Sequence, residues 1–166
     1  KATNIFLYEK SNLLKNLQKK NINNSKVKWI NNFTKIKNGP VIFFGNEFFD
    51  AIPIKQFIYK NKLLFEKNYS IDRKNKITEV FKKASIQNIK YIMKFKSTQK
   101  LKFIEFPLLG FNELQKIIKK ISKLSGGLLL IDYGYFKPLN KNTLQSVMKH
   151  KKNKLLDHLG NADITS

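Results

Sequence analysis

Residues 39–53 read GPVIFFGNEFFDAIP, a short apolar run that leads directly into polar and acidic residues. The run at residues 41–44 is β-branched and aromatic and follows a Gly-Pro pair, a pattern that predicts a buried strand. In an open α/β sheet, ligands bind just beyond the carboxyl ends of the strands. Asn46, Glu47 and Asp50 are therefore expected where a ligand would bind.

A second stretch, GGLLLIDYGY at residues 126–135, repeats this pattern farther along the chain. Residues 128–131 predict another buried strand, and Asp132 follows it directly. Tyr133 comes next, and Gly134 permits a tight turn or the close approach of a ligand. The alternative is a simple strand-to-loop turn. Two buried strands that both end in acids suggest one shared cleft at a common sheet edge.

The turn at residues 46–50 supports two interpretations. In the functional one, a carboxylate of Glu47 or Asp50 binds a cationic substrate group or accepts a proton, and the faces of Phe48 and Phe49 hold a cation. In the structural one, an amphipathic turn buries both phenylalanines and points its acids to water. Acids are scarce, 11 against 33 basic residues, and several stand at strand ends, which favours the functional interpretation.

Glu9 ends a predicted strand at residues 4–8 and precedes a predicted helix, which Ser11 can cap. An acid at this position can accept hydrogen bonds from two ribose hydroxyls, as in dinucleotide and related nucleoside sites. An ordinary surface glutamate near a helix N-terminus, where negative charge is favourable, gives the same pattern. From the local pattern alone the ordinary interpretation is the more frequent one.

The order of predicted elements is that of an α/β protein. The first part runs strand (4–8), helix, strand (27–30) and strand (41–44), and the helix is expected to turn Leu13, Leu14 and Leu17 inward. The middle holds a hairpin (54–59 with 63–66), a segment that fits helix or strand equally (77–100) and a strand (101–106). A helix at 111–124 follows, with Leu114, Ile117, Ile118 and Ile121 inward, and then a loop-rich tail with one helical turn at 143–149.

Composition limits the classes of site that this chain can hold. Its 166 residues have the size of one domain. It contains no cysteine and two histidines, His150 and His158, so thiolate chemistry is excluded and no metal site is expected. No apolar run approaches the ~20 residues that cross a bilayer. We expect a cytoplasmic bacterial protein, and an absent initiator Met and an abrupt end suggest a fragment of a longer one.

The net charge of +22 raises the question of a polyanionic partner. Arg73 is the single arginine, whereas phosphate and base recognition favour arginine with its planar fork. The lysines are spread along the whole chain among asparagine and isoleucine, as an AT-rich genome would encode. The charge is therefore attributed to a solvated surface, with nonspecific, salt-sensitive polyanion binding still expected.

Several common catalytic motifs are absent from the sequence. It contains neither a GxGxxG nor a GxxxxGK[ST] phosphate loop, no GxSxG and no HExxH. Kinase, P-loop ATPase, serine hydrolase and zincin activities all lack their key residues.

Five blocks in order resemble the MidA-like methyltransferases, bacterial relatives of the mitochondrial complex I assembly factor that methylates arginine. The residues that carry the resemblance are 46–53 (family NEFFDALP), 7–11 with 17–18 (VE-x-SP…L-x-x-x-Q), 105–107 (E-x-[SC]-P, here one position shorter), 126–135 (GG-x-LLIDYGY) and 143–165 (TLQA…H…DPL…PG-x-ADLT). The resemblance spans nearly the whole chain.

The resemblance implies a partial, Rossmann-like class I methyltransferase domain over residues 1–166, with an inserted β-hairpin region at roughly 54–104. It implies S-adenosylmethionine as cofactor, held by Glu9 at its ribose and by Asn46 and Glu47. Glu47 or Asp50 would orient an arginine guanidinium, through the bidentate pairing that carboxylates make with this group. The expected substrate-binding residues are Phe48, Phe49, Asp132, Tyr133, Gln145 and His150.

One departure from the family concerns the cofactor. The family's glycine-rich loop, which follows its first strand, precedes the part that corresponds to this sequence. That strand would lie between residues 4–8 and 41–44, so the piece alone is expected to bind cofactor poorly and to be inactive. Two alternatives to a protein arginine methyltransferase remain, a noncatalytic assembly factor that keeps the fold and a basic nucleic-acid-binding module.

Overall fold

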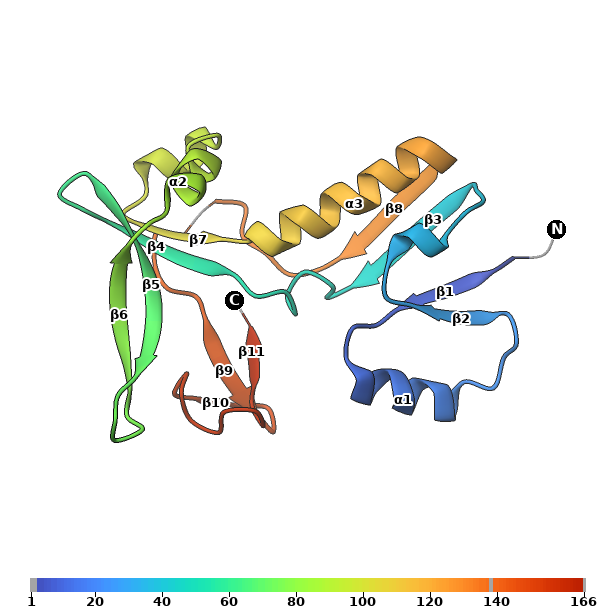
Figure 1. Cartoon of the computed structure of the whole chain (residues 1–166), viewed down its shortest axis with the longest axis horizontal. Coiled ribbons are helices and arrows are strands. Elements are labelled where there is room, and N and C mark those ends of the chain that lie inside the picture. The colour runs from blue at the N-terminus through green and yellow to red at the C-terminus, as the bar shows by residue number, and fades with distance from the viewer. Residues whose placement is uncertain (1–2, 138, 166) are drawn as a thin grey trace. The chain divides into compact units, whose positions relative to one another are not determined.

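A computed structural model describes residues 3–137 and 139–165 of the chain (Figure 1). The fold divides into two compact units. One is built from Lys1–Phe43 and Gln115–Leu128, and the other from Phe44–Leu114 and Leu129–Ser166.

Helices and strands are mixed along the chain, as expected for the α/β class. The strands are β1 (Ile5–Tyr8), β2 (Val27–Ile30), β3 (Val41–Asn46), β4 (Lys55–Lys60), β5 (Leu63–Ile71), β6 (Ile77–Lys83), β7 (Phe103–Phe106), β8 (Gly126–Ile131), β9 (Gln145–Met148), β10 (Lys151–Asn153) and β11 (Asp163–Thr165). The α-helices are α1 (Asn12–Asn21), α2 (Ile86–Ile92) and α3 (Leu108–Leu124), with short 3-10 helices η1 (Phe33–Lys35) and η2 (Lys96–Lys100).

β1 and β2 form a parallel pair in the first unit, with Ile5 in register with Val27. Parallel neighbours need a crossover, which α1 supplies. Ser11 caps this helix as predicted, because its Oγ accepts a hydrogen bond from the Leu14 N–H at 3.3 Å. The predicted order of strand, helix and strand is confirmed.

The predicted inward face of α1 is wrong. Leu13, Leu14 and Leu17 are all exposed, and the helix buries none of its residues. Amphipathic spacing predicts that a helix has an apolar side, but it does not supply a surface to cover that side. A two-stranded pair is a small surface for a helix of this length to pack on.

β3 and β8 form a second two-stranded sheet. The Val41 N–H donates to the Ser125 carbonyl at 2.9 Å, and the Glu47 N–H donates to the Ile131 carbonyl at 2.7 Å. The two bonds advance equally and in the same direction along both strands, so the strands are parallel. Their carboxyl ends therefore meet at one edge of the pair, as the sequence predicts.

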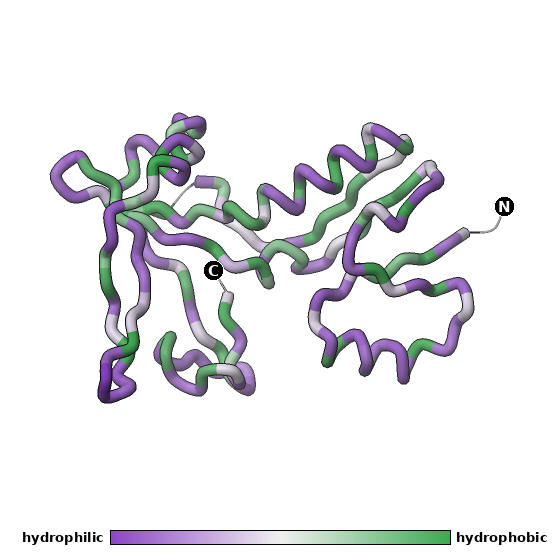
Figure 2. The backbone as a smooth tube through the Cα atoms, in the orientation of Figure 1, coloured by the Kyte–Doolittle hydropathy of each residue, from purple (hydrophilic) through white to green (hydrophobic). Residues whose placement is uncertain are grey.

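The sequence predicts that β3 and β8 are both buried. This prediction is wrong for one face of the two-stranded sheet, which is exposed. The exposed fractions there are 80% for Ile42, 66% for Phe44, 53% for Leu129 and 51% for Ile131. Side chains alternate across a strand, and Phe43, on the other face, packs edge-on against Phe33 at 5.2 Å. The hydrophobic stretches of both strands are green in Figure 2.

The second unit contains an antiparallel sheet in the order β6-β5-β4-β7. Phe57 on β4 is fully buried in its core, between Glu66 on β5 and Ile104 on β7 in the pairing register. The core cluster consists of Phe57, Leu64, Ala84, Ile92, Ile104 and Phe106. The predicted hairpin is confirmed as β4 and β5, and the ambiguous segment 77–100 contains β6, α2 and η2.

The tail contains an antiparallel sheet in the order β10-β9-β11, also in the second unit. The helical turn predicted at residues 143–149 is wrong, because β9 occupies most of it. Lys149 and His150 have left-handed φ values of 49° and 61°. Two such residues in succession make the tight hairpin turn that matches the twist of paired strands, and this turn joins β9 to β10.

α3 begins at Leu108, three residues before the predicted start, and ends at Leu124 as predicted. Ile117 is buried as expected, but Ile118 is half-exposed. Ser125 and Gly126 follow with positive φ values of 61° and 138°, which end the helix as the sequence predicts.

Candidate functional site

The turn after β3 is held in an unusual backbone conformation. Glu47 has a φ of 51°, in the left-handed region that residues other than glycine seldom adopt. Its N–H donates to the Ile131 carbonyl at 2.7 Å, so the turn is attached to the end of β8. Non-glycine residues in this region cluster at functional sites, and the side chain of Glu47 is exposed.

Asp132, the first residue after β8, completes this attachment. Its Oδ2 accepts a hydrogen bond from the Phe49 N–H at 3.0 Å, across 83 positions of sequence. Its Oδ1 accepts one from the Tyr133 N–H, also at 3.0 Å. The two stretches that the sequence singles out therefore meet, through their backbone and through this carboxylate.

Tyr133 brings a hydroxyl group to the same place. Its pKa is raised above the ordinary value, first by the hydrogen bond between its side chain and the Glu47 carboxylate. The negative charges of Glu47, Asp50 and Asp132 act in the same direction. The three carboxylates thus share one local field, and Tyr133 is 71% exposed beside them.

Asp50 is half-buried and is bound from the C-terminal sheet. Thr165, on β11, donates its hydroxyl to Asp50 Oδ1. In the register of that sheet Thr165 lies opposite Gln145 on β9. Gln145 is therefore at the end of β9 that adjoins the acidic turn, whereas His150 follows the other end of β9, in the turn to β10, and is exposed.

Phe48 and Phe49 are half-buried and contact each other edge to face, with ring centroids 5.1 Å apart. Phe49 also lies over Gly110 of α3, where an added Cβ would be 3.2 Å from its ring. These contacts support the structural interpretation for Phe49. Asn46, the last residue of β3, is exposed.

Glu9 lies in the first unit, at the carboxyl end of β1. Its Oε1 accepts a hydrogen bond from the Ser11 N–H at 2.7 Å, and Gln18 Nε2 is 3.5 Å from its Oε2. Gln18 is itself oriented by Trp29, whose indole N–H donates to Oε1 of Gln18 at 2.9 Å. Within residues 3–137 and 139–165 the contact of Oε2 is this long one, so Glu9 keeps the capacity to accept further hydrogen bonds.

The sequence analysis did not predict the hydrogen bonds of two residues, Thr165 and Glu105. Thr165 belongs to a block that carries the family resemblance, but no local pattern marks its hydroxyl as a partner of Asp50. Glu105, the penultimate residue of β7, is occupied internally. Gln56 Nε2 and the Thr143 N–H donate to its Oε1 at 2.8 and 3.0 Å, and the Thr143 hydroxyl donates to its Oε2 at 2.5 Å. It ties the 140–144 loop to the sheet.

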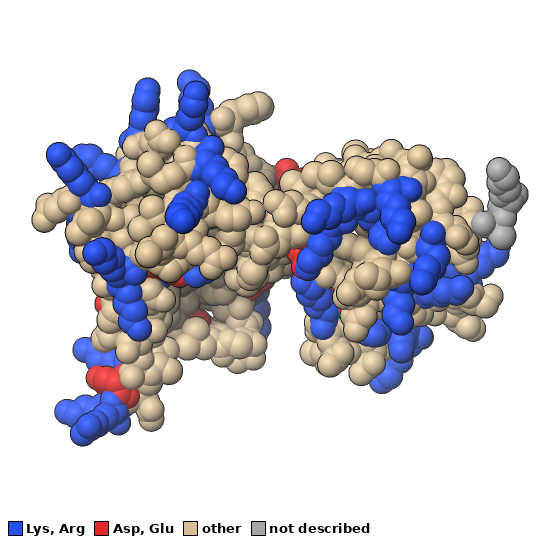
Figure 3. Space-filling view, turned by 45° about the horizontal axis from the view of Figure 1, so that its top comes forward, with Lys and Arg blue, Asp and Glu red and all other residues tan. Residues whose placement is uncertain are grey.

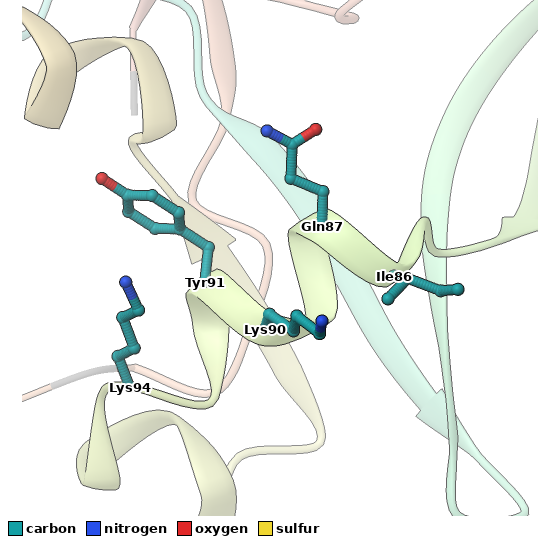
Figure 4. A pocket seen from close by; sticks show the side chains of 5 residues that line it. All are labelled: Ile86, Gln87, Lys90, Tyr91 and Lys94. Carbon is teal, nitrogen blue, oxygen red and sulfur yellow. The ribbon is translucent and has the colours of Figure 1, made fainter.

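The positive charge is spread along the chain. On the face that Figure 3 shows, lysine and arginine side chains (blue) far outnumber the acids (red). A shallow hollow of about 420 Å³ lies along α2 and is lined by Ile86, Gln87, Lys90, Tyr91 and Lys94 (Figure 4). Lys94 Nζ lies 5.0 Å from the centre of the Tyr91 ring. The lining contains no carboxylate and no residue of the predicted site.

Within residues 3–137 and 139–165, no three His, Asp or Glu side chains are grouped so as to hold a metal ion. Over the same part of the chain, no helix has the length and apolar character needed to cross a membrane.

Comparison with known proteins gives a consistent result. The profile of a family described as "Putative S-adenosyl-L-methionine-dependent methyltransferase" matches residues 1–166. The Caenorhabditis elegans "Protein arginine methyltransferase NDUFAF7 homolog, mitochondrial" is 25% identical over 141 residues, which is 83% of this chain and 33% of that protein. The chain thus spans about a third of the length of this relative.

Two solved structures from Burkholderia thailandensis have similar folds. One, bound to S-adenosyl-homocysteine, matches 86% of this chain and 38% of its own, with a TM-score of 0.65 and 18% identity. The other, a native structure, matches 86% of this chain and 39% of its own at the same TM-score and identity. This likeness confirms the predicted α/β, partial Rossmann-like fold.

Proposed function

Because the chain belongs to the family of S-adenosyl-L-methionine-dependent methyltransferases, we propose that its protein transfers a methyl group from S-adenosylmethionine to an arginine side chain of a protein substrate. The observation that carries this proposal is the attachment of the Glu47 turn to Asp132, which gathers three carboxylates at the carboxyl ends of β3 and β8. In α/β sheets this is the edge where ligands bind.

An arginine substrate is supported by charge and by one relative. A guanidinium is a planar cation with donors in a fork, and carboxylates pair with it bidentately. Glu47 offers an exposed carboxylate in a chain whose other charges are mostly positive. The similar Caenorhabditis elegans protein carries arginine methyltransferase in its name.

The residues present fit the cofactor that the family uses. Glu9 follows the first strand and has an oxygen with spare acceptor capacity, which suits the two hydroxyls of a ribose. The family resemblance is the reason for which we propose Asn46 and Glu47, at the end of β3, as further contacts of the cofactor. When bound, S-adenosylmethionine supplies an electrophilic methyl group on a sulfonium centre.

The chain's own residues would contribute orientation and a proton acceptor. Glu47 would pair with the guanidinium and turn one nitrogen toward the methyl group, so that alignment lowers the barrier. The carboxylate also stabilises the cationic substrate group in place. The new N–C bond would form as the sulfur–methyl bond breaks and S-adenosyl-homocysteine leaves, and Glu47 would accept the proton that the methylated nitrogen loses.

Cofactor binding is the first test, and it uses the complete gene product that contains this chain. Isothermal titration with S-adenosyl-homocysteine should show binding, and Glu9→Ala should weaken it by about 1–3 kcal/mol, the range for a lost hydrogen bond to a charged group. Asp157→Asn, which removes a carboxylate outside this site, is the matched control and should bind as the wild type does. If the wild type shows no binding, a noncatalytic assembly factor is the better interpretation.

Methyl transfer to arginine-containing peptides is the second test. Glu47→Gln should lower turnover while changing cofactor affinity less, because the amide keeps the shape but can neither accept the proton nor pair with the cation. Unchanged turnover would remove Glu47 from the catalytic role. Steeply salt-dependent nucleic-acid binding without any methyl transfer would instead favour the basic binding module.

A further inference from the structure

We infer that Asp132 is a positioning residue, which holds the backbone that presents Glu47 and does not itself bind the substrate. This inference rests on the proposed function, because it divides the roles of the three carboxylates at that site. It changes the sequence-based expectation for Asp132, which the family resemblance places among the substrate-binding residues.

The hydrogen bonds of Asp132 carry the argument. Both of its oxygens accept bonds from backbone N–H groups, one from Phe49 and one from Tyr133, each at 3.0 Å. A carboxylate that accepts backbone bonds in this way acts as a cap for the turn that donates them. The bond to Phe49 joins segments that are far apart in the sequence, so it fixes the place of one strand end relative to the other.

The conformation of Glu47 shows what the cap holds. Its φ of 51° is disfavoured for a side chain with a Cβ atom, and such residues persist only where the surroundings fix them. The Glu47 N–H is bound to Ile131 and the Phe49 N–H, two residues later, to Asp132. The turn is therefore attached at both ends to consecutive residues of β8 and its extension.

A second bond fixes the far side of the same turn. Thr165 donates its hydroxyl to Asp50, so that carboxylate is also engaged in holding the chain. Glu47 is exposed like Asp132, but the partner of its carboxylate is the hydroxyl of exposed Tyr133, whereas Asp132 accepts from two backbone N–H groups. Glu47 is thus the carboxylate that remains for a substrate, with Asp132 and Asp50 as its supports.

The test compares Asp132→Asn with Asp157→Asn in the complete gene product. Asparagine has the same size but keeps one acceptor oxygen, so it can satisfy only one of the Phe49 and Tyr133 N–H groups. Hydrogen exchange at the Phe49 or the Tyr133 amide should become at least about tenfold faster in Asp132→Asn, and both should remain unchanged in Asp157→Asn. If Asp132→Asn does not fold, as judged by its melting curve, Asp132→Ser is measured in the same way.

Kinetics with a synthetic arginine-containing peptide separate positioning from substrate binding. Asp132→Asn should lower kcat about 10–100-fold, the scale of an ångström of misplacement, and leave the KM for the peptide within about twofold. On a Glu47→Gln background the same change should cost less than about twofold, because the group it positions is already lost. Unchanged exchange together with a raised KM would overturn the inference and make Asp132 a substrate ligand.

Failure of the inference and failure of the proposed function give different results. If the wild type transfers no methyl group, the proposed function fails, while the exchange of the Phe49 and Tyr133 amides still decides whether Asp132 holds the turn. Thr165→Val, which replaces the hydroxyl with a methyl group, tests the second support in the same assay and should speed exchange at the Ile52 amide, which donates to the Phe49 carbonyl within the turn.

Discussion

At the scale of single residues, three of the chain's 11 acids act on one tyrosine hydroxyl. Glu47, Asp50 and Asp132 all act on the hydroxyl of Tyr133, and all three raise its pKa. A phenol that donates to a carboxylate resists ionisation, because its anion would stand beside existing negative charge. Tyr133 is therefore a reporter for the arrangement of the carboxylates around it.

The first prediction follows from that interaction. In ¹³Cζ-tyrosine NMR, with Tyr133→Phe to assign the signal, Tyr133 should titrate above the ordinary tyrosine pKa of about 10. Glu47→Gln should lower its pKa toward that value, and Asp157→Asn should leave it in place. The bond's contribution to stability is complete below the ordinary pKa and is lost as pH rises through the raised one. An unshifted signal in Glu47→Gln would show that the two side chains do not interact.

The sequence predicts which residues stand at the strand ends of the site, but not the hydrogen bonds that join them. The residues after two apolar runs identify Glu47 and Asp132 as neighbours, because parallel strands that pair bring their carboxyl ends together. The sequence does not show that Asp132 accepts a backbone bond from Phe49, since that depends on the register of β3 and β8. Local patterns do not show that Thr165 donates to Asp50 either, since that bond joins β11 to a turn 115 positions away in the sequence.

At the scale of elements, the close approach of β3 and β8 depends on one glycine. Gly126 has a φ of 138°, and a Cβ there would lie 1.7 Å from the Val41 carbonyl oxygen. Gly127, the next residue, has nothing within 4 Å of a Cβ. The adjacent pair therefore offers a matched test of how the start of β8 meets β3.

The second prediction concerns these two glycines. Gly126→Ala should destabilise the fold by more than about 2 kcal/mol, because the backbone must move and the new residue must adopt a disfavoured φ. Gly127→Ala should change the free energy of unfolding by less than about 0.5 kcal/mol. Urea unfolding followed by circular dichroism measures both. Equal effects of the two substitutions would contradict the close approach.

Element types could be predicted where the local pattern and the tertiary environment agree. β1, α1 and the β4–β5 hairpin follow from caps, turns and apolar runs. The structure of residues 143–149 could not be predicted in this way. The left-handed turn at Lys149 and His150 pairs β9 with β10, and the β10 segment lacks strong strand propensity. The exposure of Phe44 could not be predicted either, because an apolar run does not indicate which face of the strand other elements cover.

At the scale of the whole molecule, charge dominates interactions at long range. The chain carries 33 basic and 11 acidic residues, a net charge of +22. Lysines are point charges without the planar fork that reads bases, and Arg73 is the one arginine. Such a surface attracts polyanions without distinguishing their sequences.

The third prediction states this as a salt dependence. Fluorescence anisotropy with two DNA duplexes of unrelated sequence should give equal affinities at each salt concentration. If 6–10 phosphates are contacted, affinity should fall by about 10³–10⁵ between 50 and 200 mM salt. A preference of more than about tenfold for one duplex, or affinity that salt leaves unchanged, would show a dedicated nucleic-acid site.

The exposed apolar face of the β3–β8 pair has a consequence for how the polypeptide behaves in salt. Salt weakens its binding to DNA, but it should promote its self-association. Apolar surface is exposed to water at Phe44, Leu129 and Ile131. Exposed apolar surface of this kind favours aggregation. Mutual repulsion between like-charged copies keeps them dispersed in dilute buffer, but added sodium chloride shortens its reach. Light scattering from the 166-residue polypeptide should therefore report growing particles as salt is added. The same salt that releases it from DNA would bring its own copies together.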